Sequence, residues 1–452
     1  MQTVIENPRN GCGMHGVLQT VQEIRGVVPV VHSNAGCAVS NYLANRASGS
    51  GNDYVSGYDI PGTNVQERHV IFGGASRLRE QIKNTLKVAD GRLYIVLNSC
   101  ESAMVGDDVD AMTREAQEQH ESVINSLTAG FHGDSHFGYE SVLVDIIRQL
   151  PAVRPVPEEK IPNLVNIFGI VPQKDVCFKG NLEEIRRVLE GIGVKANIFF
   201  GSADGTEEFA LAPAASLNLV FSKWGIRAAK ELEKLYKTQY LVFPYIPTGI
   251  REVRAFAEEI LDKLALDPEP AGRFLEEEER QFRYYLSGIA ESFYREKAGR
   301  RIAIVGDESD VRRYSSYLSE YLGAVVTDAV ITDDFPDGET TQNERAEALK
   351  DIAGQVCFSQ DSAEIAKIIK NSEAQLILAS SLEDEAACRK GIPNLAVSYP
   401  VYGKAILTKS HAGIRGALTL TEDYMTKIKE SSQERERELE AFLFSSEKKE
   451  KK

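Results

Sequence analysis

Short apolar runs alternate with segments of helical periodicity along most of the 452-residue chain. The apolar runs at 27–31 and 93–97 each lead into a polar stretch and then into an amphipathic segment. This alternation is typical of strand–helix units in a parallel sheet. We therefore expect an α/β fold of three Rossmann-like domains, in which parallel sheets are flanked by helices.

Two breaks divide the pattern. Residues 150–162 hold four prolines, which fix the backbone and remove hydrogen-bond donors, so we expect a linker there. The charged stretch 275–298 predicts a long connecting helix. The domains are then 1–155, 160–298 and 299–430, and the polar tail 431–452 is expected to be a frayed helix with a disordered end. The later domains are predicted from strands at 165–170, 196–200, 217–221, 240–243, 301–305, 374–379 and 395–398, and helices at 181–192, 225–236, 250–264 and 309–322.

The net charge of the chain limits the classes of partner that it is expected to bind. There are 52 Lys and Arg against 67 Asp and Glu, a net charge of −15, which disfavours nucleic acid or an anionic membrane. No apolar stretch reaches the roughly 18 residues of a transmembrane helix, and the first residues lack the features of a signal peptide. We expect a cytoplasmic protein, whose six cysteines are free thiols, metal ligands or nucleophiles rather than disulfides.

Three cysteines occupy positions suited to a ligand. Cys37 and Cys100 follow predicted strands, where parallel sheets bind ligands, and Cys12 lies in a glycine-rich loop. Neighbouring glycines let the backbone approach a bulky group, and helix-start amides stabilise an anionic iron–sulfur–thiolate assembly. No CxxC occurs, which excludes a zinc ribbon or a bacterial ferredoxin. Three thiolates leave a four-iron cluster one ligand short, so another residue type or another chain is needed; three inert buried thiols are the alternative.

The remaining cysteines and two acidic residues have plainer expectations. Asp107 and Asp108 are expected to be an exposed capping pair rather than an acid–base pair. The other three cysteines are expected to be packing thiols, the first of them in an exposed loop: Cys177, Cys357 and Cys388.

Several histidines and one pair of glycines each have more than one candidate role. His15 and His32 lie near the candidate ligands and either tune a cluster through hydrogen bonds or satisfy local backbone groups. His132 and His136 flank a glycine-rich turn, which argues against a helical zinc pair. The glycines at 73–74 are expected to serve close packing, with phosphate binding as the alternative.

Three sequence runs resemble the component 1 proteins of nitrogenase. They are CGMHGVL at 12–18, VHSNAGC at 31–37 and NSCESAMVGDD at 98–108. The similarity continues through ERHVIFGG at 67–74, AGFHG at 129–133, PTGI at 247–250, YPVY at 399–402 and GIRG at 413–416. The resemblance therefore covers most of the chain, and its three cysteine segments are the specific part.

The resemblance implies three Rossmann-like domains and an α2β2 heterotetramer with a homologous α-type subunit. It implies an iron–sulfur cluster, [8Fe-7S] P-cluster-like or [4Fe-4S], shared with that partner and held here by Cys12, Cys37 and Cys100. Electrons would come from an ATP-hydrolysing iron protein. This chain has no GxxxxGK[ST] phosphate loop, so ATP hydrolysis is not expected in it.

The family pattern also bears on the type of subunit. An α-type chain anchors its metal cofactor through a cysteine of the middle domain and a histidine near the C-terminus. The segment around 214–221 offers no cysteine, and His411 lies too close to GIRG to match, so we expect a β-type chain in which His411 is structural.

One departure leaves the role open. A serine that can touch the cluster in nitrogenase β subunits corresponds here to Gly130, in a segment more like α-type or scaffold chains, and the long N-terminal extension is missing. The first expectation is a β-type subunit that relays electrons to a metallocofactor on its partner, in nitrogen fixation or in reduction of another substrate. The alternatives are a scaffold subunit for assembly of the iron–molybdenum cofactor and a cluster-free α/β binding protein.

Overall fold

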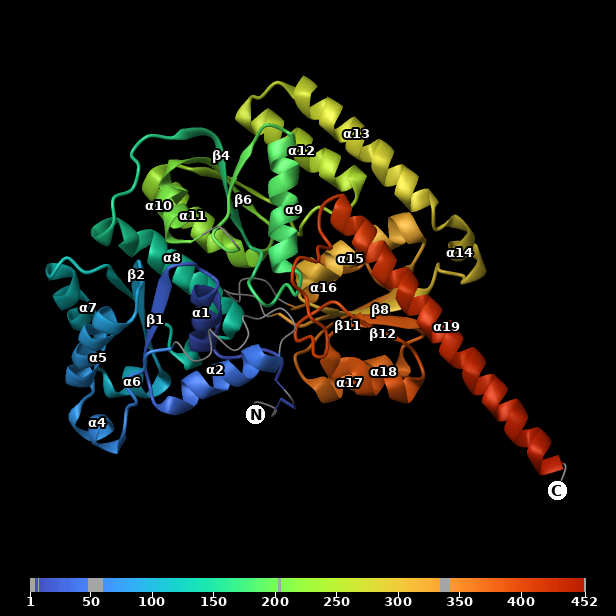
Figure 1. Cartoon of the computed structure of the whole chain (residues 1–452), viewed down its shortest axis with the longest axis horizontal. Coiled ribbons are helices and arrows are strands. Elements are labelled where there is room, and N and C mark those ends of the chain that lie inside the picture. Colours follow the sequence, from blue (N-terminus) through green and yellow to red (C-terminus); the bar gives the residue numbers. More distant parts are fainter. Residues whose placement is uncertain (1–4, 7, 48–59, 202–204, 334–341, 451–452) are drawn as a thin grey trace.

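The computed structural model describes residues 5–6, 8–47, 60–201, 205–333 and 342–450 (Figure 1). In these ranges the named strands form three sheets, and every strand pair within them is parallel. Figure 1 shows the first sheet at lower left, the second at the top and the third at lower right, each beside its own helices. The predicted α/β fold class, parallel sheets flanked by helices, is confirmed.

The first part of the chain forms a three-stranded sheet between two layers of helices. Its elements are α1 (Gly13–Gln22), β1 (Val27–His32), α2 (Ala35–Ala47), α4 (Glu67–Phe72), α5 (Ala75–Val88), β2 (Leu93–Asn98), α6 (Cys100–Val105), α7 (Val109–Glu118), β3 (Val123–Ser126), η1 (Gly130–His132) and α8 (Ser135–Val153). Successive side chains point to opposite faces of a strand. One face of the sheet therefore packs against α5 and α7, and the other packs against α1 and α8.

Helices α1 and α8 cross at very short range. A Cβ atom on Gly16 would lie 2.0 Å from the carbonyl oxygen of Ser135, and one on Gly138 would lie 2.1 Å from the oxygen of Gly13. Only glycine permits so close an approach of two backbones. The glycines that follow Cys12 thus allow two helices to pack closely. The sequence suggests a different role for them, the admission of a bulky ligand.

The second sheet has the strand order β5-β4-β6-β7. Its elements are β4 (Ile161–Phe168), α9 (Phe178–Gly191), β5 (Lys195–Asn197), α10 (Thr206–Leu211), η2 (Ala212–Ala214), β6 (Ala215–Val220), η3 (Lys223–Gly225), α11 (Ile226–Tyr236), β7 (Gln239–Val242) and α12 (Ile250–Leu264). The predicted strands and helices of this region are all present, although β5 ends three residues earlier than expected.

The linker is shorter at both ends than the range 150–162 that the sequence predicts. Helix α8 continues through Pro151 to Val153, because a proline in the last turn removes only one helical hydrogen bond. At the other end Pro162 lies inside β4, beside an irregularity in strand pairing between Ile161 and Val165, where a missing N–H is tolerated. Only residues 154–160 connect the two elements.

The third sheet has the order β10-β9-β8-β11-β12. Its elements are β8 (Arg301–Gly306), α15 (Glu308–Leu322), β9 (Val325–Ile331), α16 (Gln342–Leu349), β10 (Gln355–Phe358), α17 (Ser362–Asn371), β11 (Leu376–Ala379), η4 (Ser381–Glu383), α18 (Asp384–Lys390) and β12 (Asn394–Ala396). Strands β9 and β10 were not predicted. Thr327 and Asp328 interrupt the apolar run of β9, and β10 is short, so neither gives a clear strand pattern.

The connecting helices differ from their prediction. The helix expected over 275–298 begins at Pro268 as α13 (Pro268–Ser287), capped by Asp267, and breaks before α14 (Ala290–Arg295). The C-terminal helix α19 (Arg415–Glu450) extends away from the body of the protein (Figure 1). The polar tail is therefore helical as far as Glu450, and residues 451–452 lie outside the described residues.

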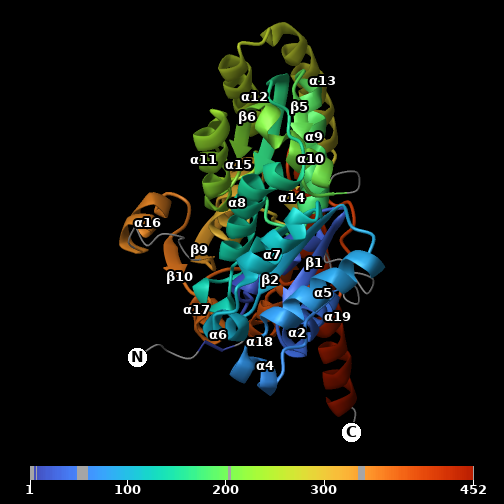
Figure 2. The ribbon, with the colours of Figure 1, turned by 90° about the vertical axis from the view of Figure 1, so that its left-hand side faces the viewer.

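One hydrophobic core cluster includes residues from all three sheets and from α19. Figure 2 shows the second sheet standing above the first, with α8 running between them. The boundaries expected near 155, 298 and 430 remain a prediction, because this core is continuous across them. Within the described part of the chain, no helix combines the length and apolar character that crossing a membrane requires.

Candidate functional site

Each of the three candidate cysteines lies at the start of a helix. Cys37 is in the first turn of α2, after β1, and Cys100 opens α6, directly after β2. Both positions follow the carboxyl ends of neighbouring parallel strands, as the sequence predicts. Cys12 is the N-cap residue of α1 rather than a loop residue, and α2 begins at Ala35, earlier than expected. Unpaired amides and the helix dipole at such ends favour an anionic thiolate.

Two of the sulfur atoms meet at Gly130. A Cβ atom on this glycine would lie 2.9 Å from Sγ of Cys12 and 2.9 Å from Sγ of Cys100. Gly130 opens η1, and the next turn of chain is tied to Cys12 by a β-bridge between Cys12 and Asp134. The two thiols, 88 residues apart in sequence by their numbers, therefore face the same small space, which only glycine leaves free.

Cys37 belongs to the same group. Burial, the carboxylate of Glu101 and the thiolates of Cys12 and Cys100 together raise the pKa of Cys37 to about 11. The backbone carbonyl of Cys37 accepts from Nε2 of His15, and the other ring nitrogen of this histidine contacts Sγ of Cys12. The structure thus brings all three candidate cysteines together, and it leaves each of them only partly buried.

His15 joins two of the cysteine segments. Its Nδ1 lies 3.3 Å from Sγ of Cys12, and its Nε2 lies 3.1 Å from the carbonyl oxygen of Cys37. A carbonyl only accepts, so Nε2 carries a hydrogen, and Nδ1 either accepts from the thiol or donates to the thiolate. Burial raises the pKa of Cys12, but the hydrogen bond and charge of His15 outweigh it and set this pKa below its ordinary value. Burial lowers the pKa of His15, and the contacts with Cys12 outweigh it in the opposite direction.

His32 and Asp107 form a buried contact at the end of β1. Nε2 of His32 lies 2.9 Å from Oδ2 of Asp107, whose Oδ1 accepts from the backbone N–H of Gly74 at 2.7 Å. Burial lowers the pKa of His32 more than Asp107 raises it. The prediction of an exposed capping pair is correct for Asp108, which caps α7, and wrong for Asp107. The side chain of Asp107 is buried and connects the end of β1 to the start of α5. This carboxylate also fills the space beside the glycines at 73–74, as the expected close packing requires.

Large apolar side chains are exposed around the cysteines. Met104 of α6 is 80% exposed and Phe131, next to Gly130, is 59% exposed. In α4, which packs beside α6, Ile71 and Phe72 are 64% and 85% exposed. Exposed large apolar side chains that gather near one site are a feature of interaction surfaces.

The remaining cysteines lie away from this group. Cys177, expected in an exposed loop, is 2% exposed and caps α9, where it packs with Val176 and Val401. Cys357 lies in β10 and Cys388 in α18. Among the described residues, Cys12, Cys37 and Cys100 included, no three His, Cys, Asp or Glu side chains are placed to hold a single metal ion.

A model of the family described as nitrogenase component 1 type oxidoreductase matches residues 12–429. The chain belongs to this family. It is 25% identical over 448 residues to the nitrogenase vanadium-iron protein beta chain of Trichormus variabilis, covering 91% of each chain. It is 23% identical over 397 residues to the nitrogenase iron-molybdenum cofactor biosynthesis protein NifE of Methanococcus maripaludis, covering 85% of this chain and 78% of that one.

The molybdenum-iron protein beta chain of Methanococcus maripaludis is 24% identical, over 94% of this chain and 95% of its own. A solved structure titled nitrogenase Cp1 at pH 6.5 has a TM-score of 0.77, with 18% identity and coverage of 95% and 94%. At that identity the likeness shows the fold alone. The expected family resemblance is confirmed, and the relatives include both beta chains and a cofactor biosynthesis protein.

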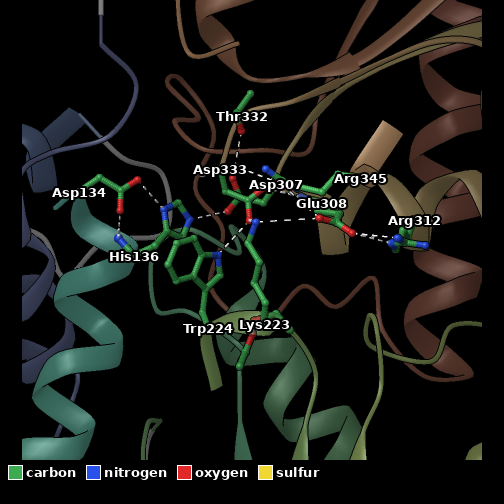
Figure 3. Close-up of polar contacts among 12 residues, drawn as sticks. Asp134, His136, Lys223, Trp224, Asp307, Glu308, Arg312, Thr332, Asp333 and Arg345 are labelled. Atoms are coloured by element: carbon green, nitrogen blue, oxygen red, sulfur yellow. Dashed lines mark hydrogen bonds and ion pairs between the residues drawn. The ribbon is translucent and has the colours of Figure 1, made fainter. Parts of the chain in front are cut away.

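The junction of the three sheets holds functional groups that the sequence did not reveal (Figure 3). His136, at the start of α8, lies 2.7 Å from Oδ2 of Asp307, which follows β8, and 3.3 Å from Oδ2 of Asp134. Its ring stacks on Trp224 of η3 at 4.9 Å, and Nε1 of Trp224 donates to Asp333 at 2.9 Å. Burial lowers the pKa of His136, but Asp307 and Asp134 outweigh it and raise this pKa to about 10. The sequence suggested His136 only as an unconvincing zinc ligand, because its partners lie far away along the chain.

His411 is buried in this member of the family, and a purely structural role for it remains a prediction. Its Nδ1 lies 3.2 Å from the hydroxyl of Tyr314, and its Nε2 lies 2.8 Å from Oδ2 of Asp423. Both ring nitrogens are therefore engaged by protein groups. The cavity at the junction, beside Trp224 and Arg313, has a volume of only about 20 Å³, enough for about one water molecule.

Proposed function

We propose that the chain is a β-type subunit of a nitrogenase-like reductase. In this proposal it holds one half of an interface iron–sulfur cluster through Cys12, Cys37 and Cys100. It receives electrons from an ATP-hydrolysing iron protein and passes them to a metallocofactor on a homologous α-type partner, in an α2β2 heterotetramer.

The observation that carries the proposal is the convergence of the cysteines. Two sulfurs contact the space at Gly130, and the carbonyl of the third cysteine, Cys37, contacts His15, which also contacts Cys12. All three cysteines are only partly buried, so their sulfurs are not sealed inside the core as Cys177 is. Thiolates at helix starts, with one coordination position left for another chain, suit a cluster shared across an interface.

A bound iron–sulfur cluster supplies reversible one-electron transfer. The chain's own residues bind it and adjust its surroundings. The three thiolates are the ligands, and Gly130 leaves the space between two of them free of side-chain atoms. His15 orients Cys12 and, through the carbonyl of Cys37, fixes the distance between two ligand segments.

The exposed apolar side chains support a partner at this surface. Met104 and Phe131 flank the cysteines, so a protein that covers them also covers the exposed side of the sulfurs. Exclusion of water by such a partner would lower the local dielectric constant around the cluster, which is one way in which proteins set its potential.

Two features near the junction of the three sheets support the assignment as a β-type chain. His411 has no free ring nitrogen for a metal, and the cavity beside Arg313 is too small for a metallocofactor. Both features support a substrate-reducing site on the partner rather than at this junction.

A scaffold role in cofactor assembly is the second candidate. It is favoured by the similarity to the biosynthesis protein NifE and by glycine rather than serine at position 130. Turnover by the complex with its iron protein separates the two roles, since a scaffold releases a precursor cluster and does not reduce substrate catalytically.

The experiment is anaerobic copurification of the full chain with its partner, followed by iron and sulfide analysis and EPR. Cys37→Ala and Cys100→Ala are expected to abolish the broad iron–sulfur absorbance, and Cys388→Ala, in exposed α18, is the matched control. Unchanged iron content in both ligand variants would refute the cluster assignment. An iron-free wild-type complex would favour the third alternative, a cluster-free α/β binding protein.

A further inference from the structure

Glu101 connects two of the segments that carry the candidate cysteines. It follows Cys100 in α6, and its Oε1 accepts a hydrogen bond from the backbone N–H of Asn34 at 2.7 Å. Asn34 lies in the loop between β1 and α2, three residues before Cys37. One carboxylate on the helix of Cys100 therefore holds the loop that leads to Cys37.

The two ends of this loop are held differently. At the end of β1, the carbonyl oxygen of His32 accepts from the backbone N–H of Ser99 at 3.1 Å and from the hydroxyl of Ser102 at 3.0 Å. Residues 34–36, which come next, are exposed. Among the described residues outside the loop, only Glu101 hydrogen-bonds to 34–36 through its side chain. Because little packing restrains an exposed loop, this one bond limits its movement.

The carboxylate also brings a charge to the site. Glu101 is partly exposed, and it forms no ion pair within the described part of the chain. Its negative charge is therefore not offset by a cation of this chain. Net charge is one of the factors that set the reduction potential of an iron–sulfur cluster, and added negative charge disfavours the reduced form.

We propose that Glu101 is a positioning residue, which holds Cys37 at the distance from Cys100 that a shared cluster requires. This inference rests on the proposed function and adds a residue that is not itself a ligand. Its action parallels that of His15, which contacts both Sγ of Cys12 and the carbonyl oxygen of Cys37. Together the two side chains hold the middle cysteine segment to each of the others.

The first test compares iron binding in complexes purified without oxygen. Glu101→Ala removes the acceptor but leaves all three thiols, and it is expected to weaken iron binding at least about tenfold in competition with a chelator. Glu101→Gln keeps an oxygen acceptor and is expected to retain the iron. Because its charge is lost, the midpoint potential of its cluster is expected to become more positive, a shift that a purely structural residue would not cause.

A matched control lies in the second sheet region. Glu208 is also partly exposed, and its Oε2 accepts from the backbone N–H of Gly205 at 2.7 Å, as Glu101 does from its own partner. Glu208→Ala therefore removes the same kind of bond away from the cysteines, and wild-type iron binding is expected. Equal iron loss in Glu101→Ala and Glu101→Gln would show that the charge matters rather than the bond, and would contradict positioning.

The second test does not need a cluster. Hydrogen exchange at the amide of Asn34 is measured by mass spectrometry in the full chain freed of iron. Exchange in Glu101→Ala is expected to be at least about tenfold faster than in the wild type and in Glu101→Gln. Unchanged exchange in Glu101→Ala overturns the inference, as does wild-type iron binding by that variant. An iron-free wild-type complex instead refutes the cluster assignment, while the exchange rates still decide whether Glu101 holds the loop.

Discussion

Replacement of His136 by glutamine tests the electrostatic account of the three-sheet junction. The side chain is fully buried between Asp307 and Asp134, at 2.7 and 3.3 Å. Glutamine offers one amide donor but no charge, so two largely buried carboxylates lose their cation. Removing one partner of a buried ion pair costs about 3–5 kcal/mol, and we expect a loss of about 3 kcal/mol in the free energy of unfolding because Lys174 still offsets part of the charge.

The dependence of stability on pH gives a second test of the same ion pairs. The folded-state pKa of His136, about 10, lies above the ordinary value of 6.5, so its stabilisation is complete below about pH 6.5 and is lost as pH rises toward 10. Across that window the free energy of unfolding is expected to fall as pH rises, with a slope of at most about 1.4 kcal/mol per pH unit. In His136→Gln this slope disappears.

The assay is urea denaturation followed by the fluorescence of Trp224, the only tryptophan of the chain, which stacks on His136. His132→Gln, an exposed histidine four positions earlier, is the matched control and should keep the wild-type slope. A loss below about 1 kcal/mol at pH 7, together with an unchanged slope from pH 7 to 9, would show that His136 is neutral in the folded protein.

Three further predictions concern the cysteine site, the exposed surface and a buried ion network. Gly130→Val is expected to lower iron content per chain at least about tenfold, because its Cβ would lie 2.9 Å from two sulfurs, while Gly272→Ala, which has open space around it, should keep full iron content. Met104→Asp is expected to reduce copurification of the partner subunit, measured by light scattering after size exclusion, and Val88→Asp, equally exposed on α5, should not; equal effects would argue against this surface as the interface. Arg187→Ala leaves two nearly buried glutamates without their bidentate partner and is expected to destabilise the fold by about 3 kcal/mol in urea denaturation, a result that a change below about 1 kcal/mol would contradict.

Local sequence predicted most of the sheet strands and the positions of the cysteines relative to them. Apolar periodicity is a short-range signal, so β1, β2 and α12 could be placed from it. The predictions failed where a tertiary contact outweighed local preference. Pro151 is accommodated in the last turn of α8, and the polar residues of β9 are tolerated because that strand pairs with β8 on one side and β10 on the other.

For the candidate site, the sequence supplied the ligand types but not the partners of the surrounding side chains. His15 was expected near the cysteines, yet its two contacts depend on the distance between α1 and α2. Asp107 was misplaced at the surface because burial of a carboxylate is decided by the elements that pack over it. The same reason applies to Cys177, which the packing of α9 against the C-terminal loop buries.

The sequence by itself determined the family, the α/β fold class and the three cysteine segments, because motifs and hydrophobic periodicity are written in neighbouring positions. Only the tertiary structure decided that two sulfurs meet at Gly130 and that His136 lies beside a carboxylate 171 positions away. Distances between side chains on different elements, and the loss of water around them, exist only after the chain has packed, and these two quantities set both the geometry of a ligand site and the pKa of a buried group.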